Sequence, residues 1–356
     1  MERSIGFKTN PQGNYKFPLA FSKQQDLKEL TGHVLAADVG GTKTNLSLYQ
    51  IGHGELQPIK QKSYITKEHS SFQEIVTKFK NKDLPEINSL CLGVAGPVNK
   101  GVVKGTNFPW IIDEKVIRRA LDIKNVAIIN DMEANAFGLG ALEDSDFEEI
   151  RKGAEVAGNA IIISPGTGLG EAGLFWDGKA YHPFATEGGH SEFSPRNQFD
   201  ADLWHFLHKK YGLVSWERIL SGSGIYDIYQ FLIHSRGIKE PTWFKERILH
   251  KDPAALISAA AMEGNYPVCK ETIDLFVRYL ATEANQFALK TKATGGIFIG
   301  GGIVPKIIKT IDKEVFNQNF IKSDRMEHLL ELMPVKAILN EKTATYGAAL
   351  YGAMLL

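Results

Sequence analysis

The sequence has very little cysteine for its length. Only two of its 356 residues are cysteine, Cys91 and Cys269, and neither lies in a CxxC pair. Two distant cysteines supply neither the paired thiolates of a structural zinc site nor the disulfide framework of a small secreted domain. We therefore expect two reduced cysteines in a hydrophobic core.

The sequence also lacks an excess of charge of one sign and lacks long hydrophobic runs. Lys plus Arg and Asp plus Glu both total 41, so a polyanion such as DNA is not the expected partner. No segment approaches the roughly 18 uninterrupted apolar residues of a membrane helix, and the run FPLAF is too short for a signal peptide. These absences predict a cytoplasmic protein with no nucleic-acid and no membrane partner. The length allows two domains, each with its own core.

Apolar segments typical of strands alternate with amphipathic segments typical of helices, which predicts an α/β protein. The expected strand segments are HVLAADVGGTKTNLSLYQI, INSLCLGVAG, NVAIIND, AIIISPGTGLGEAGLFWDG and GGIFI. The expected helices are SFQEIVTKFK, VIRRALDI, MEANAFGLGAL, ETIDLFVRYLATEANQFALK and TATYGAALYGAMLL. We expect residues 1–33 to form a polar arm with a short helix at SKQQDLKEL, and EDSDFEEIRKGAEVAGN to be charged surface.

One glycine segment matches the GxGxxG pattern of dinucleotide-binding folds through Gly168, Gly170 and Gly173. That motif needs a helix that opens at its last glycine. Here the following residues, AGLFWDGKAY, alternate and turn at Asp177-Gly178, which is typical of a hairpin. We therefore interpret the match as accidental.

Two glycine-rich loops occur in the same context, a strand, a turn and a second strand. Tight loops of this kind expose several backbone N–H groups that suit phosphate oxygens, and no Walker A sequence is present. Their repetition indicates a duplicated architecture in which two hairpins clamp a nucleotide's phosphates, with a third glycine turn left for the adenosine end. The loop residues are Asp38, Gly40, Gly41, Thr42 and Thr44, then Gly166, Thr167 and Gly168, and finally Gly300, Gly301 and Gly302.

These three loops resemble the first phosphate, second phosphate and adenosine loops of the actin/hexokinase/Hsp70 ATPase superfamily. Within it, GVAGPV, TNFPW, IINDMEANAFG, TEGGHSEFSP and WERILSGSGI resemble bacterial-type glucokinase, in the family's order. The resemblance implies a two-domain actin-like ATPase (ribonuclease H-like) fold with an interdomain cleft, and a homodimer. The implied parts are an N-terminal arm (1–33), a small domain (34–131 plus 343–356) and a large domain (132–342).

The sequence departs from a related group of sugar kinases and repressors. Members of that group resemble the segment EGGH but carry a cysteine-rich zinc motif soon after it. This chain has no cysteine between Cys91 and Cys269, and it shows no N-terminal helix-turn-helix signature. The glucokinase branch is therefore the better match.

The resemblance implies ATP-dependent phosphorylation of D-glucose to glucose 6-phosphate, with glucose and Mg-ATP as ligands. Asp131, which follows the strand NVAIIN, is then the base that accepts the proton of the 6-hydroxyl. From the residues alone, Asp131 can equally be the N-cap of the helix MEANAFG. The implied sugar-binding residues are Asn107, Asn130, Asp131, Glu187, His190 and Glu217. Asp38 is the implied Mg²⁺ ligand, either directly or through water.

Several alternatives stay open at this point. The set His182, Glu187, His190 and Glu192 can be interpreted as a metal cluster, although it has no thiolate and is interrupted by two glycines. Trp110 is expected in the core and Lys43 in solvent. Other functions that fit in part are a kinase for another hexose (mannose or an N-acetylated sugar), a sugar-binding regulator without catalysis, and a filament-forming actin relative.

Overall fold

The computed structural model of the chain describes residues 5–6, 17–21, 29–105, 108, 110–154 and 156–356. Asn107 and most of SKQQDLKEL lie outside the described residues. The chain divides into two compact units. The first takes in Met1–Asp144, Ala172–Ala185 and Asn340–Leu356, and the second takes in Ser145–Glu171 and Thr186–Leu339.

The first unit is built on a six-stranded sheet in the order β1-β4-β3-β2-β5-β8. β2 is antiparallel to β3 and parallel to β5, and β5 is parallel to β8. The strands are β1 (Ile5–Gly6), β2 (Gly32–Val39), β3 (Lys43–Gly52), β4 (Glu55–Ile65), β5 (Ser89–Val94) and β8 (Asn125–Asn130). A separate pair consists of β6 (Val102–Lys104) and β7 (Ile111–Asp113).

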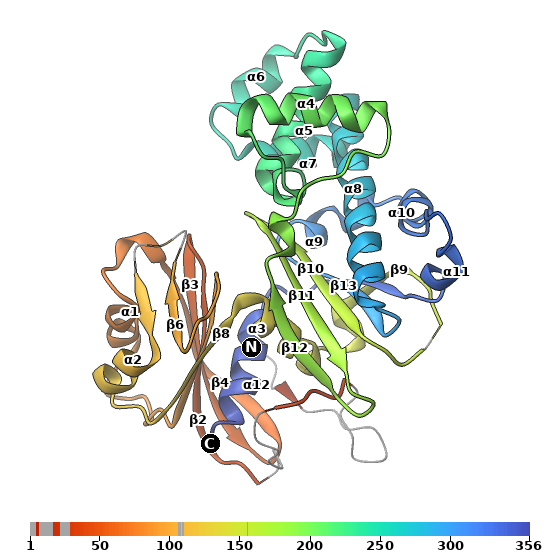
Figure 1. Cartoon of the computed structure of the whole chain (residues 1–356). Helices are drawn as coiled ribbons and strands as arrows, with labels where there is room; N and C mark the ends of the chain where they lie inside the picture. The colour runs from red at the N-terminus through yellow and green to blue at the C-terminus, as the bar shows by residue number, and fades with distance from the viewer. Residues whose placement is uncertain (1–4, 7–16, 22–28, 106–107, 109, 155) are drawn as a thin grey trace. The chain divides into compact units, whose positions relative to one another are not determined.

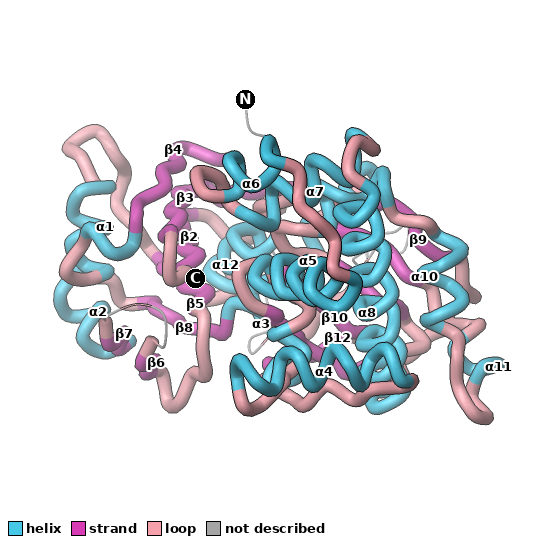
Figure 2. Tube along the Cα trace, turned by 90° about the horizontal axis from the view of Figure 1, so that it is seen from above, coloured by secondary structure: helices cyan, strands magenta, loops and turns pink. Residues whose placement is uncertain are grey.

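Helices cover both faces of this sheet, which Figure 2 shows nearly edge-on. α1 (Phe72–Phe79) and α2 (Glu114–Leu121) lie on one face, and α3 (Asp131–Gly138) and α12 (Thr343–Ala353) lie on the other. α3 and α12 pack closely because glycine lies at their contact: a Cβ on Gly347 would lie 1.7 Å from the carbonyl oxygen of Ala134. Because α12 also packs on η2 (Leu139–Ala141), the first unit continues past the expected boundary at residue 131.

The described part of the N-terminal arm is packed against the first unit. Leu19 is buried and forms a parallel bridge with Tyr181. The ring of Phe21 stacks on that of Phe137, with 5.3 Å between the ring centroids. Apolar residues of the arm therefore contribute to the packing of this unit, which the weak polar pattern of residues 1–33 did not predict.

The second sheet has the order β12-β11-β10-β13-β14-β9, and β10, β13 and β14 are parallel. Its strands are β9 (Phe147–Arg151), β10 (Ala160–Pro165), β11 (Leu169–Trp176), β12 (Tyr181–Thr186), β13 (Gly296–Ile299) and β14 (Val335–Ile338). The expectation that EDSDFEEIRKGAEVAGN is only charged surface is wrong for β9. This strand pairs with β14, and its Ile150 is buried although its neighbours are charged.

In the second unit, α4 to α7 lie together beyond one end of the sheet, and the long helix α8 runs beside β10 and β13 (Figure 1). The helices are α4 (Gln198–Tyr211), α5 (Gly222–Arg236), α6 (Thr242–Ile248), α7 (Pro253–Glu263), α8 (Pro267–Thr291), α9 (Val304–Ile307), α10 (Lys313–Phe320) and α11 (Glu327–Leu330). The remaining 3-10 turns are η1 (Thr66–Glu68), η3 (Asp144–Asp146), η4 (Gly188–His190), η5 (Trp216–Arg218) and η6 (Ile308–Thr310).

Two further expectations concern the core. Cys91 and Cys269 are both buried and free, which confirms two reduced core cysteines. Trp110 is buried and its indole N–H donates to the carbonyl oxygen of His69, so it is a core residue as expected. Across the described residues, no helix is long and apolar enough to cross a membrane.

Candidate active site

In the first unit, the carboxyl ends of three parallel strands meet at one edge of the sheet. Val39 pairs with Val94, and Val94 pairs with Asn130. The glycine turn after β2 and Asp131 after β8 therefore lie at the same edge, which is where open α/β sheets bind ligands. Asn130 is the N-cap of α3, because its Oδ1 accepts from the N–H of Met132 at 2.8 Å. The N-cap alternative for Asp131 is thus wrong, since Asp131 is the first helical residue.

The side chain of Asn130 holds protein backbone at both of its polar ends. Besides capping α3, its Nδ2 donates to the carbonyl oxygen of Gly96 at 3.1 Å. The carboxylate of Glu133 accepts from the N–H of Asn130, which completes a capping box. Burial raises the pKa of Glu133, and this backbone hydrogen bond opposes the rise. Asn130 therefore fixes the start of α3, and with it the position of Asp131.

The turn between β2 and β3, formed by Gly40, Gly41 and Thr42, is held from behind by two threonines. The hydroxyl of Thr66 donates to the carbonyl oxygen of Gly40 at 2.7 Å, and it also bonds the hydroxyl of Thr44. Thr44 is fully buried, whereas Thr42 is exposed. Thr44 thus supports the turn from inside, and Thr42 is the threonine that a ligand can reach.

Asp38 lies at the end of β2, half-buried beside Asn45. The Nδ2 of Asn45 donates to Asp38 Oδ2 at 3.1 Å, and the hydroxyl of Ser63 in turn donates to Asn45 Oδ1. Burial raises the pKa of Asp38, and the hydrogen bond from Asn45 opposes that rise. A divalent cation near this carboxylate would offset the cost of its burial, so the residue fits a Mg²⁺ site. Lys43 is exposed, as expected.

In the second unit, the second and third glycine loops line one pocket of about 570 Å³. Gly166 and Thr167 of the second loop and Gly302 of the third contribute to its wall. The N–H of Gly222 donates to the carbonyl oxygen of Gly166 at 2.9 Å, which ties α5 to the loop. The other lining residues are Ser223, Ile225, Asp252, Ala254, Ala255, Ser258, Met262, Ile303, Lys306 and Ile307.

The shape of this pocket depends on the glycines of the third loop. Gly301 has a φ of +79°, and a Cβ there would lie 2.3 Å from the carbonyl oxygen of Pro165. Gly300 donates its N–H to the carbonyl oxygen of Ile163 at 2.8 Å, which joins the loop to β10. A Cβ at Gly302 would meet no atom within 4 Å, so this position faces open space. The loop therefore has a fixed backbone and one open side.

Sequence reasoning missed much of the pocket wall. α7 and Lys306 line it, yet the nucleotide-binding residues expected from this unit were only glycines and threonine. The signal for Lys306 was its place in GGIFIGGGIVPKI, four residues after Gly302, the last expected loop residue. α7 has no such signal, because its small residues Ala254, Ala255 and Ser258 are common in any close-packed helix.

Three of the expected sugar ligands lie on two short turns of the second unit. Glu187 immediately precedes η4 and His190 ends it, with 3.9 Å between Glu187 Oε2 and His190 Nε2. Both side chains are exposed. Glu217 lies in η5 and is half-buried. The structure thus presents two carboxylates and an imidazole, which together accept and donate hydrogen bonds to hydroxyl groups.

The two turns are joined by backbone hydrogen bonds. The N–H of Phe193 donates to the carbonyl oxygen of Val214 at 2.9 Å, and the N–H of Trp216 donates to that of Ser191 at 3.0 Å. The rings of Phe193 and Trp216 meet edge to face, with centroids 5.0 Å apart. The two turns therefore form one connected unit, which carries Glu187, His190 and Glu217.

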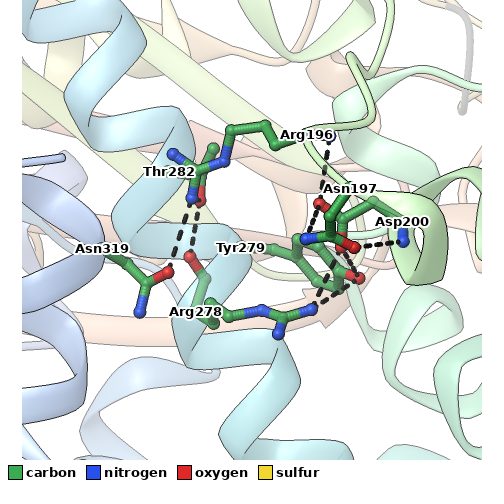
Figure 3. Close-up of polar contacts among 7 residues, drawn as sticks. All are labelled: Arg196, Asn197, Asp200, Arg278, Tyr279, Thr282 and Asn319. Carbon is green, nitrogen blue, oxygen red and sulfur yellow. Dashed lines mark hydrogen bonds and ion pairs between the residues drawn. The ribbon is translucent and has the colours of Figure 1, made fainter. Parts of the chain in front are cut away.

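The end of the segment that carries Glu187 and His190 is anchored to α8 through a polar network (Figure 3). Asp200 is buried, and its Oδ1 accepts from Arg278 at 3.1 Å and from Tyr279 at 2.9 Å. Its Oδ2 accepts from the backbone N–H of Arg196 and from the amide of Asn197. Each oxygen of this buried carboxylate is thus satisfied, which is what makes its burial tolerable.

The metal-cluster alternative finds no support in the described residues. They contain no group of three or more His, Cys, Asp or Glu side chains placed to hold a metal ion. His182 instead bonds Asp177, with 2.7 Å between His182 Nε2 and Asp177 Oδ2. That hydrogen bond, with two backbone N–H groups, holds the pKa of Asp177 at about 2.

Comparison with known proteins agrees with this geometry. The glucokinase family model matches residues 35–354. A glucokinase of Nostoc punctiforme is 36% identical over 340 residues, which cover 90% of this chain and 99% of that protein. The crystal structure of a glucokinase from an Antarctic psychrotroph has a TM-score of 0.75 at 29% identity, covering 89% of this chain and 97% of that one. The crystal structure of a ROK family glucokinase from Streptomyces griseus, in complex with glucose and AMPPNP, has a TM-score of 0.62 at 18% identity. The match covers 90% of this chain and 99% of that one, and at this identity it supports the fold alone.

The fold and its glycine loops define an enzyme of the actin-like ATPase class, with α/β sheets in two lobes. Within that class, the chain belongs to the glucokinase family. Its activity is the phosphorylation of glucose, and the family uses ATP as the phosphoryl donor.

Proposed function

We propose that the chain transfers the γ-phosphoryl group of ATP to the 6-hydroxyl of D-glucose, with Asp131 as the base. As the hydroxyl oxygen attacks phosphorus, its proton passes to the Asp131 carboxylate, and the bond between the γ-phosphorus and the bridging oxygen of ADP breaks. The position of Asp131 at the carboxyl edge of the first sheet, on a helix start that Asn130 and Glu133 fix, supports this role. Asn130, expected as a sugar ligand, acts in this proposal by positioning Asp131, because both polar ends of its side chain bond protein backbone.

The proposed glucose ligands are Glu187, His190 and Glu217, and their interlocked turns are the observation that carries the proposal. Backbone hydrogen bonds between the two turns preorganise the three side chains before sugar arrives. A polar site of this kind favours a sugar that carries every hydroxyl, because a polar group that bound sugar covers is left without a partner when a hydroxyl is missing. The contact expected for Asn107 stays a prediction.

The pocket of the second unit is proposed to hold the adenosine end of ATP, with the glycine turns on the phosphates. Its volume of about 570 Å³ lies in the range of small-molecule sites. Gly166, Thr167 and Gly302 line it, and Gly300 and Gly301 fix the loop that forms its wall. Gly168 closes the second loop by accepting from the N–H of Gly166, and Gly40, Gly41 and Thr42 form the other phosphate turn. Thr44, which is buried, supports that turn without touching the nucleotide.

Asp38 is the proposed residue for Mg²⁺, either directly or through water. When bound with ATP, Mg²⁺ neutralises charge on the β- and γ-phosphates. We place the enzyme in the cytoplasm as a homodimer, as the family resemblance implies, and sedimentation of the purified chain measures the dimer mass.

The test measures ADP release with Mg-ATP across a panel of hexoses, for the wild type and Asp131→Asn. We expect turnover with glucose that falls by about 10²–10⁴ in kcat in the variant, the usual contribution of a positioned base. Asp83→Asn, which changes an exposed carboxylate of the same unit, is the matched control and should retain wild-type kcat. A fall in Asp131→Asn no larger than in the control would reject Asp131 as the base.

A further inference from the structure

Two buried carboxyl groups that the reaction does not use face each other between β11 and α8. Glu171 of β11 is 2% exposed and Glu283 of α8 is 1% exposed. The two carboxyl groups lie within hydrogen-bonding reach of one another. Among the described residues, Glu171 Oε1 and Glu283 Oε2 have no hydrogen-bond partner. Two carboxyl groups at this distance share a hydrogen bond only when one of them carries a proton.

Electrostatics agrees with this protonation. Burial raises the pKa of Glu171 to about 7 and that of Glu283 to about 9, and the charge of Glu171 adds to the rise at Glu283. The exposed ammonium of Lys290, further along α8, lowers both values. The other charged side chains on the turns nearest to β11 are Glu187, His190, Glu217 and Arg218.

The pair lies directly against the turn that carries Glu187 and His190. A Cβ added to Gly188 would lie 2.0 Å from Glu171 Oε2, so this glycine packs on the carboxyl group itself. A Cβ on Gly189 would lie 2.2 Å from the carbonyl oxygen of Leu169, which shows that the next residue packs on the backbone of the same strand. Small residues at both positions let the turn reach the strand this closely.

A second connection joins the turn to Glu171 through the backbone. The hydroxyl of Thr186 donates to the carbonyl oxygen of Glu171 at 3.0 Å and accepts from the N–H of Gly188 at 3.2 Å. The backbone and the side chain of Glu171 therefore both contact the residues that flank Glu187. A movement of the Glu171 carboxyl group toward Gly188 would therefore press on the turn that carries Glu187 and His190.

We propose that Glu171 and Glu283 form a proton-sharing pair that holds the turn at Gly188, and thereby positions Glu187 and His190 for glucose. This inference rests on the proposed sugar-binding role of those two residues. Loss of the shared proton places two like charges side by side in an apolar setting, and their repulsion displaces the Glu171 carboxyl group toward Gly188. Both glutamates are positioning residues, because neither reaches the sugar itself.

The test compares the wild type with Glu171→Gln/Glu283→Gln, in which neutral amides replace the pair, and with Asp274→Asn, an exposed carboxylate on the same helix. Glucose KM, ATP KM and kcat are measured from about pH 7 to 9.5. In the wild type and the Asp274 variant we expect glucose KM to rise about three- to tenfold, the effect of one lost hydrogen bond, with ATP KM unchanged by comparison. In the double variant the rise disappears.

Glu171→Ala is a second variant, since it removes the contact with Gly188 without changing a sugar ligand. It should raise glucose KM by about three- to tenfold at pH 7 with little change in kcat. The same rise of KM with pH in the double variant, or an unchanged KM in Glu171→Ala, would overturn the inference. Glu187→Gln is measured in parallel: if it leaves glucose KM unchanged, the proposed sugar site is wrong and the inference falls with it. If it raises KM while the pair variants do not, only the pair inference fails.

Discussion

The backbone N–H of Leu169 donates to Glu217 Oε2, with 3.0 Å between the two atoms. A proposed sugar ligand is therefore held by the strand that leaves the second glycine loop. The residue before Leu169 is Gly168, and a Cβ there would lie 2.3 Å from the same carboxylate oxygen. The absence of a side chain at Gly168 is what allows Glu217 to come so close.

Gly168→Ala should therefore weaken glucose binding while the fold is kept. The new methyl group meets the end of a flexible side chain, which moves away and loses its hydrogen bond to Leu169. Because a hydrogen bond to a charged group is worth about 1.5–3 kcal/mol, we expect glucose KM to rise by about tenfold or more. Steady-state kinetics and a thermal melt measure the two effects. Gly52→Ala, where a Cβ meets no atom within 4 Å, is the control and should change neither.

Adjacent glycines of the third loop should respond differently to alanine. Gly301→Ala forces a side chain onto a positive φ and against the carbonyl oxygen of Pro165, so it should lower the free energy of unfolding by about 1–3 kcal/mol. Gly302→Ala places a methyl group in open space beside the pocket, so it should raise ATP KM with little loss of stability. Urea unfolding and ATP titration separate the two outcomes. Equal losses of stability in both variants would contradict the conclusion that Gly301 is constrained and Gly302 faces open space.

Asp200→Asn should destabilise the second unit strongly. The amide keeps one acceptor but presents N–H groups where the carboxylate accepted from Arg196 and Asn197, and it leaves the charge of Arg278 without its partner. Breaking a buried pair of this kind costs about 3–5 kcal/mol, which urea unfolding detects. Asp202→Asn, an exposed aspartate on the same helix, should stay within about 0.5 kcal/mol of the wild type. Similar losses in the two variants would argue against the network.

The stability of the chain should fall as pH rises through neutrality. The pKa values of Glu171 and Glu283 rise from the ordinary 4.5 to about 7 and about 9 in the fold. Between about pH 4.5 and 9 the folded state binds more protons than the unfolded state. The contribution of the pair to the free energy of unfolding is therefore fully present below about pH 4.5 and is lost as pH rises through the folded pKa values. We expect a decrease of a few kcal/mol from about pH 5 to 9 by urea unfolding. Glu171→Gln/Glu283→Gln should show a smaller slope, and an equal slope would assign the effect to other groups.

The alternation of strands and helices could be predicted because each long apolar segment carries a clear period. The helix ETIDLFVRYLATEANQFALK lies within α8 (Pro267–Thr291), and the hairpin at Asp177-Gly178 excludes the dinucleotide motif. β9 was missed because only Phe147 and Ile150 are apolar among its five residues. Its partner β14 lies far along the chain, and a strand of this composition is recognisable only through that pairing.

Residue roles at the site were harder to predict than the loops that carry them. The N-cap of α3 is Asn130 and not Asp131, a difference of one residue that the composition does not resolve, since both types cap helices well. Thr44 is buried and hydrogen-bonded to Thr66, which directly follows β4, a contact that the loop sequence alone does not reveal. The contact of Glu171 with Glu283 joins residues more than a hundred positions apart, so GEAGL alone gives no sign of it.

The packing of residues 17–21 against the first unit matters for the solubility of a shortened chain. A chain trimmed to the family match at residues 35–354 would lose Leu19, whose side chain covers Gly140, and Phe21, which stacks on Phe137. Tyr181 would lose its stacking on Phe17, and Phe137 and Tyr351 would lose their contacts with Phe21, which uncovers part of each ring. Newly exposed apolar surface of this kind promotes aggregation, so low solubility of a trimmed chain would reflect the missing segment and not a defective catalytic core.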